Sequence, residues 1–585
     1  MELRWNLSEL YSDTSKLQQD INKLKELSNK IIATKGKLTT KQGLLDFYNI
    51  AQIFSWTQEK IVTYLFLRKS LNGADVFALE KLEELENFLQ QHSLNITFVL
   101  QEMKTIPNKT LLEWSKLPEF KDFDQDLKDI IKIKKHTLPE SQEKLMIGAS
   151  YTANHRELMD CLDNVEIKYG KTKDEQGKTV KITNQNAHVL SSSNIKEVRK
   201  ATINKIYKAY KSLNQTIATN FISHLKYSSF VAKAYKYKNT LDMCLKTEDL
   251  PNNLPQIVVK HVTSNLDLLH EYYAWRKQFM KLDKFESCDI FCNIFDNNSV
   301  NQKYTLPQAI SIIKKALKPL GTEYTNMLDT AVKNNWIDSV YLPAKETGAY
   351  CLCLYGMHPH ILLTYDDTQN SVTTLAHEFG HAMNAYYSNK TQPYSKCENE
   401  IFLAEIASTV NEVLLADYFI STAKNTKEKI LHITNFLSTF ISTVFTQTEY
   451  TEFELYVHNC IDQNEPLNYK KLNDFYLSLQ KKYCGKDVNV LKLSQYHWSR
   501  IPHFYRDFYV FKYVTGFISA CAIVNKLKQD KNYKNTYIQF LSAGSSEYPC
   551  DILKNAQVDI LDANTYKQAF ELFKSYIDIL KNTKE

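Results

Sequence analysis

The sequence predicts a mainly α-helical protein, and three observations support this fold class. The 585 residues include only 13 Gly and 13 Pro, whereas turn-rich β architectures need both residue types at their corners. Between residues 17 and 133, apolar residues recur at three- and four-residue spacing with Lys and Glu between them, as in amphipathic helices. The same pattern dominates after residue 195, apart from a β-like stretch within residues 340–365.

The amino-acid composition and the most apolar stretches indicate what kind of protein this is and which partners it lacks. Hydrophobic residues make up 43% and charged residues 24%, which is typical of a soluble globular chain. The net charge of +6 gives no reason to expect a nucleic-acid partner. The most apolar stretch, residues 513–524, is shorter than the ~20 residues that span a bilayer, so no membrane partner is expected. Because the first residues lack an apolar signal-peptide core, we expect a cytoplasmic location and reduced thiols for the 11 cysteines.

A change of periodicity suggests a domain boundary. Residues 165–169 and 180–182 alternate apolar with polar side chains around a polar turn at 174–177, which predicts a β-hairpin. Residues 191–194 supply candidate caps for the next helix, and Glu197 lies three residues after Asn194, as in a capping box. We therefore predict an N-terminal helical domain, residues 1–190, that ends in the hairpin, and a catalytic domain, residues 191–585.

The β-like stretch predicts a small sheet ahead of one particular helix. Its expected strands are residues 340–342, 349–354 and 361–365, and residues 366–371 supply a turn and a helix cap. The strand through residues 348–351 is a candidate edge on which a peptide backbone could pair. Cysteine pairs at 288/292 and 351/353 could each be half of a metal site, but buried inert thiols are the simpler interpretation.

The helix after the sheet carries a metal-binding pattern. His377 and His381 are four residues apart, so they share one helix face and both imidazoles can reach a single zinc ion. Glu378 projects beside them, where it can accept a proton from a zinc-bound water. The alternative interpretation is a helix with two surface histidines and an exposed glutamate.

Zinc hydrolases use a third protein ligand and leave the fourth position for water. Metzincins would have Gly at 384 and His at 387, but this chain has Asn384 and Tyr387, which excludes that class. Glu405, in an apolar helical segment 24 residues after His381, is the candidate third ligand because a lone carboxylate there requires a partner.

Other glutamates near this segment remain alternatives. Glu398 and Glu400 compete with Glu405 as ligands, although both fall in the polar approach to the helix. Glu412, two turns after Glu405, could accept a hydrogen bond from a ligand histidine or could simply be solvated.

With these motifs, the sequence resembles the oligoendopeptidase F branch of the thimet-type zinc oligopeptidases, peptidase family M3. The resemblance covers nearly the whole chain, and one departure is Asn384, where the family often has His after the second ligand. It rests on segments 5–11, 198–201, 348–350, 377–381, 403–409 and 501–505.

The resemblance implies a fold and a site. The implied fold is gluzincin-like: a large helical body encloses a deep substrate channel, and a small β-sheet lies next to the zinc-binding helix. It also implies that His503 and a nearby tyrosine contact the substrate carbonyl. Tyr505 and Tyr509 are the candidates, because with Tyr513 they are spaced to share one helix face and a phenol can donate to an oxyanion. Core packing is the alternative role for these rings.

The predicted function is a zinc-dependent endopeptidase with one Zn²⁺ per chain. It would hydrolyse internal bonds of short unfolded oligopeptides by attack of a zinc-bound water, with Glu378 as general base. Two rivals stay open: a zinc exopeptidase that trims dipeptides, and a non-catalytic peptide-binding protein. Manganese or cobalt would suit the same ligands. The oligomeric state is not predicted.

Overall fold

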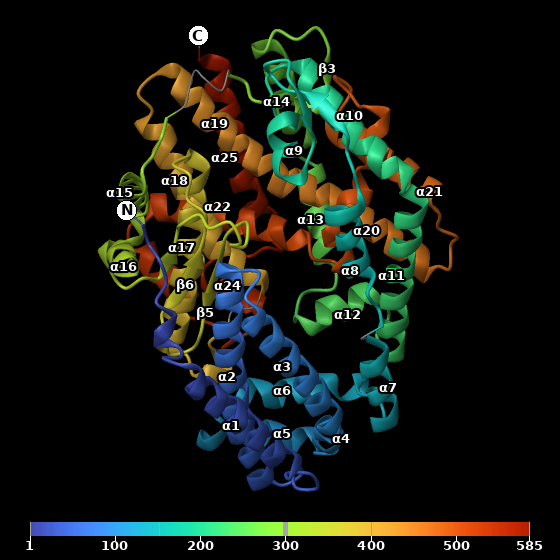
Figure 1. The fold of residues 1–585 in the computed structure, drawn as a ribbon, viewed down its shortest axis with the longest axis vertical. Coiled ribbons are helices and arrows are strands. Elements are labelled where there is room, and N and C mark those ends of the chain that lie inside the picture. The colour runs from blue at the N-terminus through green and yellow to red at the C-terminus, as the bar shows by residue number, and fades with distance from the viewer. Residues whose placement is uncertain (1, 151, 296–301, 399–400, 584–585) are drawn as a thin grey trace. The chain divides into compact units, whose positions relative to one another are not determined.

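The computed structural model describes residues 2–150, 152–295, 302–398 and 401–583 (Figure 1). Helices dominate these residues, and the strands are short, so the predicted fold class is confirmed. The chain forms two compact units, each assembled from three stretches. The first comprises Met1–Tyr151, Lys303–Leu415 and Lys526–Gln557, and the second comprises Thr152–Gln302, Ala416–Asn525 and Val558–Glu585.

The first unit contains the N-terminal helices, the three-stranded sheet and the helix that bears the histidine pair. Its helices are α1 (Thr14–Ile32), α2 (Lys41–Leu71), α3 (Val76–Asn95), α4 (Phe98–Met103), α5 (Asn108–Trp114), α6 (Asp124–Ile133), α7 (Glu140–Ser150), α15 (Leu306–Ala316), α16 (Thr322–Lys333), α17 (Gln369–Thr391), α23 (Tyr533–Leu541) and α24 (Pro549–Asn555). Helices α18 (Ile401–Thr422) and α22 (Phe511–Gln529) each run from one unit into the other.

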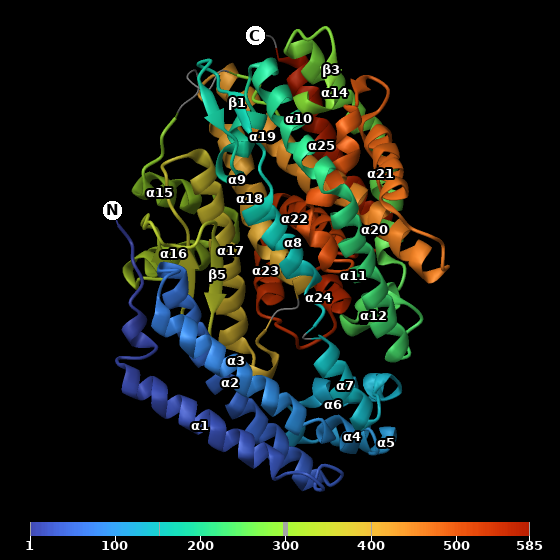
Figure 2. The ribbon, with the colours of Figure 1, turned by 45° about the vertical axis from the view of Figure 1, so that its right-hand side comes forward.

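One apolar core joins the N-terminal helices to the sheet of the first unit. Figure 2 shows α1 and α2 side by side, and they contact each other along their length. Their buried residues share a cluster with Leu354 and Leu362, which belong to the sheet region more than two hundred residues later. A hydrogen bond adds to these apolar contacts: the indole N–H of Trp5 donates to the Trp336 carbonyl over 3.0 Å.

The sheet has the strand order β4-β6-β5, so β5 lies at an edge. Strand β5 (Tyr350–Cys353) pairs antiparallel with β6 (Pro359–Leu362), and β4 (Ile337–Asp338) pairs with β6 in parallel. Both β5 and β6 pack against α17. The predicted strand at 340–342 is wrong, because this segment forms a loop. The buried Lys345 ammonium stabilises the loop by donating hydrogen bonds to the carbonyls of Asp338, Val340 and Leu363.

The second unit is a helical body with two small strand pairs. Its helices are α8 (His155–Cys161), α9 (Asn184–Ser191), α10 (Lys196–Ser212), α11 (Asn214–Ala234), α12 (Thr240–Thr247), α13 (Leu254–Thr263), α14 (Leu266–Phe279), α19 (Thr426–Phe440), α20 (Thr446–Asp462), α21 (Tyr469–Cys484) and α25 (Ala563–Asn582). Strands β3 (Phe285–Glu286) and β7 (Val488–Asn489) pair in parallel.

The predicted β-hairpin exists but begins later than expected. Strands β1 (Lys171–Lys173) and β2 (Thr179–Lys181) pair antiparallel, whereas residues 162–166 form a π-helical turn. The predicted caps at 191–194 are wrong as helix caps, because α10 has no side-chain cap hydrogen bond. Ser193, one of these candidates, accepts the Ile195 N–H just before the helix begins. The division at residue 190 stays a prediction; the nearest boundary between compact units falls at 151/152.

The structure also describes the state of the cysteines and the apolar character of the helices. All eleven cysteines are free, and Cys288 and Cys292 are buried. In the part of the chain that the structure describes, no helix combines the length and the apolar character needed to cross a bilayer.

Candidate metal centre

Helix α17 begins and packs as the sequence predicts. The Thr368 hydroxyl accepts the Ser371 N–H over 3.2 Å at the helix start, and the Asp366 carboxylate accepts from both hydroxyls. Leu375 and Phe379, on the core-facing side of the helix, are fully buried. This packing fixes the rotation of the helix, so the opposite side carries the two histidines.

A glycine lets α18 approach α17 closely. A Cβ atom on Gly380 would lie 2.5 Å from the Ser408 Cα and 2.7 Å from the Ala407 carbonyl oxygen, far inside contact distance. One turn away, the Asn411 amide donates to the Ala376 carbonyl over 2.9 Å and accepts from the Tyr324 hydroxyl. These contacts place the α18 residue Glu405 opposite the α17 histidines. Sequence reasoning missed Asn411 and the requirement for Gly380, although a glycine between two candidate ligands was a visible signal.

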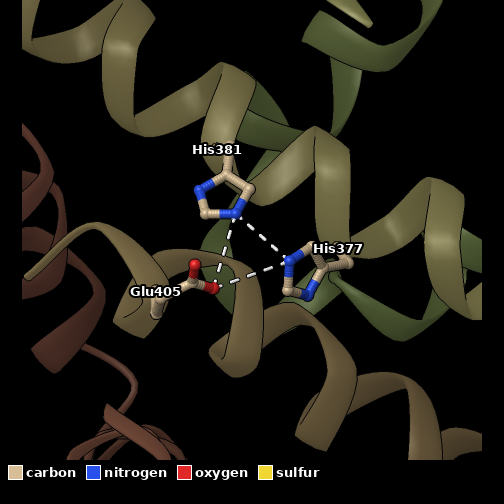
Figure 3. A group of neighbouring side chains, drawn as sticks. All are labelled: His377, His381 and Glu405. Carbon is tan, nitrogen blue, oxygen red and sulfur yellow. Dashed lines mark hydrogen bonds and ion pairs between the residues drawn. The ribbon is translucent and has the colours of Figure 1, made fainter. Parts of the chain in front are cut away.

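The structure brings the three predicted metal ligands together (Figure 3). The Nε2 atoms of His377 and His381 are 3.1 Å apart, and Glu405 Oε2 lies 3.7 and 3.6 Å from them, respectively. Donor atoms about 2.0–2.2 Å from a tetrahedral ion lie roughly 3.3–3.6 Å from one another. Two imidazole nitrogens and one carboxylate at this spacing therefore fit zinc, with a fourth position left for water.

Glu412 orients the first histidine. Its Oε1 atom accepts a hydrogen bond from His377 Nδ1 over 2.6 Å, which leaves the Nε2 atom to face the other donors. Burial alone would lower the pKa of His377, but this bond and the nearby carboxylates raise it to about 9. For His381, burial and the charge of His377 lower the pKa to about 3. Of the two roles left open for Glu412, the geometry matches the hydrogen-bond acceptor.

Glu378 is a buried carboxyl with an altered proton affinity. Its side chain is 5% exposed, and its Oε2 atom has no hydrogen-bond partner among the described residues. Burial raises the pKa of Glu378 to about 7, and Glu405 and Glu412 add to the effect while His377 opposes it. A carboxyl that titrates near neutral pH can both accept and release a proton, as a general base must.

Of the two competing glutamates, Glu398 alone lies within the described residues. Glu398 is exposed and lies outside the donor cluster, and Glu400 falls outside the described residues. Asn384, the departure from the resembled family, donates from its amide to the Leu541 carbonyl over 3.2 Å and is not among the donors.

One other donor group occurs among the described residues, and it contains Cys288. Its partners Glu286 and Asp289 are buried, but each carboxylate is already neutralised. Arg199 lies 2.6 Å from Asp289 and Lys200 lies 2.8 Å from Glu286. An ion-paired cluster of this kind has no spare negative charge for a cation, so its role is structural.

The segment with His503 differs from its prediction. Residues Pro502–Tyr505 form a 3₁₀ turn, and α22 begins only at Phe511, so Tyr505, Tyr509 and Tyr513 do not share one helix face. The helix cannot extend backwards because Phe508 adopts a left-handed backbone with φ of 52°. The His503 ring stacks on Tyr509, with ring centroids 6.2 Å apart, and its Nε2 lies 3.4 Å from the Tyr513 hydroxyl. A contact of this segment with substrate stays a prediction.

Comparison with known proteins places the chain in a family. The profile described as "Peptidase family M3" matches residues 189–572, and one described as "Oligopeptidase F" matches residues 102–157. The chain belongs to peptidase family M3. Oligopeptidase PepF of Bacillus subtilis (strain 168) is 33% identical over 522 residues, which cover 89% of this chain and 78% of that protein. This relative and the family profiles agree that the M3 chain is of the oligopeptidase F type.

Solved structures agree with this assignment. A Chlamydophila abortus protein assigned provisionally to the peptidases superposes with a TM-score of 0.89 and 27% identity, covering 99% of this chain and 97% of that one. An oligoendopeptidase F from Enterococcus faecium superposes with a TM-score of 0.77 and 24% identity, over 97% and 98% of the two chains, and shows the shared fold. The protein is thus an M3 metallopeptidase that acts on peptide bonds of oligopeptides, and membership in this family implies zinc.

Proposed function

We propose that this M3 oligopeptidase is a zinc endopeptidase that cuts internal bonds of short, unfolded oligopeptides. The observation that carries the proposal is the donor group of His377, His381 and Glu405 with the buried Glu378 beside it. A structural cluster would pair its carboxylates with cations, as the Glu286 and Asp289 group does. Here the one carboxylate of the group, Glu405, faces the Nε2 atoms of two histidines, and among the described residues no Lys or Arg forms an ion pair with it.

His377, His381 and Glu405 would hold one zinc ion per chain. When bound there, zinc supplies a Lewis acid that polarises the scissile carbonyl and lowers the pKa of a water. Glu412 keeps the His377 ring in the orientation and tautomer that directs Nε2 to the donor group. The rigid contact of α17 with α18 at Gly380 holds Glu405 in place without help from the substrate.

Glu378 would act as the general base. It accepts a proton from the attacking water and passes that proton to the departing amine, which balances the hydrolysis of one peptide bond. Burial supports this role, because it raises the pKa of the carboxyl to about 7 and so makes both proton transfers accessible near neutral pH.

His503, together with Tyr505 or Tyr509, would stabilise the negative charge that develops on the carbonyl oxygen. The Tyr505 hydroxyl accepts the Asn220 amide N–H over 3.2 Å, so its own proton stays available for donation. The Tyr509 ring is buried and lies under the Arg506 guanidinium at 4.0 Å, which holds it in a defined orientation.

The substrate backbone would pair with the edge of β5. Among the described residues, β6 is the one strand paired with β5, and main-chain pairing binds peptides with little regard to side chains. A deep channel that admits only short peptides and a cytoplasmic location remain predictions.

A doubly blocked peptide separates endopeptidase from exopeptidase activity. An N-acetylated, C-amidated nonapeptide and its free-ended counterpart are incubated with the zinc-loaded enzyme, and the products are identified by mass spectrometry. We expect both to be cut at the same internal bond at rates within about tenfold. Release of dipeptides from the free-ended peptide alone would contradict the proposal and favour the exopeptidase. Binding without cleavage of either peptide would favour a peptide-binding protein.

A further inference from the structure

A buried carboxylate anchors the segment that carries His503, Tyr505 and Tyr509. Asp507 lies between the 3₁₀ turn and α22, and its side chain is only 13% exposed. Its Oδ1 atom is 3.0 Å from His224 Nε2 on α11 and 3.3 Å from His458 Nε2 on α20. Burial alone would raise the pKa of Asp507, but the two histidine bonds hold it well below its usual range. An ionised carboxylate thus joins this segment to two helices.

The residue after Asp507 is held in a conformation that its side chain disfavours. Phe508 has a φ of 52°, in the left-handed region, where the backbone of a bulky residue is strained. Its N–H donates to Glu454 Oε1 over 2.9 Å, and its ring lies 4.5 Å from the His458 ring. Glu454 and His458 both belong to α20, so this helix offsets the strain at the point where the chain turns into α22. Strain kept in place by surrounding contacts points to a functional reason for the turn.

Helix α11 holds the other side of the segment. The Asn220 amide donates to the Tyr505 hydroxyl over 3.2 Å and to the His155 carbonyl over 2.8 Å. The Tyr505 ring packs beside the His224 ring, with centroids 5.3 Å apart. Phe504 is buried in the apolar core of the unit. Core packing at Phe504 attaches the segment to the unit, and the contacts of Asn220 and His224 with Tyr505 add a directional constraint on it.

We infer that Asp507, bound by His224 and His458, is a positioning residue that orients His503 and its neighbouring tyrosines toward the substrate carbonyl. This inference deepens the proposed function and rests on the role proposed there for His503. Asp507 itself need not touch the substrate. It acts by fixing the turn from which the His503 ring, stacked on Tyr509, projects. Misplacement of a catalytic contact by about 1 Å costs on the order of 100-fold in rate, so a small movement of this turn is enough to matter.

The test variant is Asp507→Asn, which keeps the shape of the side chain and removes its charge. The matched control is Asp289→Asn, because Asp289 is also a buried carboxylate bound by two cationic side chains, Lys196 and Arg199. Both purified variants are compared with wild type for zinc content, thermal unfolding temperature, and kcat and KM on a quenched fluorescent nonapeptide. We expect both to unfold at a lower temperature and to retain zinc. Only Asp507→Asn should lose kcat, by about 10- to 100-fold, with KM within about threefold.

A double-mutant cycle distinguishes positioning from general destabilisation. The same substitution is made in a His503→Ala background. If Asp507 acts through His503, Asp507→Asn should lower kcat there by less than about threefold. A loss of the same factor in both backgrounds would overturn the inference, and so would an unchanged kcat in the single variant.

Three further outcomes would each give a clear answer. If Asp507→Asn does not fold, His458→Gln removes one of the two imidazole bonds, and we expect a smaller loss of kcat with the same dependence on His503. If His503→Ala alone leaves kcat at the wild-type value, the proposed role of His503 is wrong. If His503→Ala lowers kcat but Asp507→Asn does not, the proposed function survives and only the positioning role falls.

Discussion

Glu378 and Glu412 have different tasks because their surroundings differ. Burial would lower the pKa of His377, but Glu412, which accepts its Nδ1 proton over 2.6 Å, and the carboxylates of Glu378 and Glu405 raise it to about 9. Glu378 has no such partner for its Oε2 atom, and burial raises its own pKa to about 7. One carboxylate therefore orients a ligand, and the other is available to exchange protons with a water.

Replacing Glu412 with Gln should change how zinc binding depends on pH. With its pKa raised to about 9, His377 is mostly protonated at pH 8, so zinc must displace close to one proton from it. Without the Glu412 charge, burial should lower the pKa of His377, so the variant should release fewer protons when zinc binds. It should also bind zinc about 10- to 100-fold more weakly, because the His377 ring loses the group that orients it. Calorimetry at pH 8 in buffers of different ionisation enthalpy measures both quantities.

The exposed Glu398 supplies the control for this experiment. Glu398→Gln removes a carboxylate from the same stretch of chain without touching the donor group, so its zinc affinity and proton release should match wild type. Equal proton release in wild type and Glu412→Gln would show that Glu412 does not govern the proton on His377.

At the scale of elements, the contact between α17 and α18 sets the spacing of the donor atoms. Gly380→Ala would place a Cβ 2.5 Å from the Ser408 Cα, and because this neighbour is backbone, the helices must separate. We expect the variant to lose about 1–3 kcal/mol of unfolding free energy, as overpacking does, and to bind zinc at least about tenfold more weakly. Denaturant titration and competition with a chelator measure the two effects.

Gly148→Ala is the matched control for Gly380→Ala. Gly148 also lies in a helix, α7, and nothing lies within 4 Å of a Cβ built there. Alanine favours helix by about 0.5–1 kcal/mol over glycine, so this variant should be equally or more stable and should keep its zinc. Zinc affinity unchanged by Gly380→Ala would refute the claim that the close approach of the two helices builds the site.

The sequence was informative where a feature is local. The spacing of His377 and His381, the cap before α17 and the apolar side of that helix could all be read from periodicity, and the structure has them. Periodicity failed at Tyr505, Tyr509 and Tyr513, because a left-handed Phe508, held by α20, interrupts a pattern that fits a helix. The imidazole bonds of Asp507 join it to His458 and His224, which lie 49 and 283 positions away, and no local pattern reveals them.

At the scale of the whole molecule, each compact unit combines stretches that are far apart in the sequence. The first unit combines N-terminal helices with the sheet and the metal-ligand helices from residues 303–415. Its core joins Leu44, Leu65 and other residues of the first 130 positions to Leu354 and Leu362 beside α17. Composition and periodicity allowed the mainly α fold class to be predicted, but no composition change in the sequence marks this interleaved division.

A truncated chain tests the predicted division at residue 190. A fragment of residues 191–585 lacks the N-terminal part of this core and would expose Leu354 and Leu362 to water. Burial of a leucine contributes about 1.5–3 kcal/mol, so we expect the fragment to unfold without a cooperative transition and to hold no zinc. Calorimetric scanning and metal analysis, with the full chain as control, give the answer. A cooperative, zinc-loaded fragment would establish residues 191–585 as an autonomous catalytic domain.

The zinc ligands and the general base have separate roles in the proposed mechanism, so zinc binding and catalysis should be separable by mutation. The most direct measurement is cleavage of a quenched fluorescent nonapeptide by wild type and Glu378→Gln, with zinc content determined on both. We predict one zinc per chain in each protein and a loss of about 10²- to 10⁴-fold in kcat for the variant, because the ligands remain and only the general base is gone. Absence of zinc from the wild type, or cleavage by Glu378→Gln at a rate close to wild type, would contradict the proposed metal centre and its mechanism.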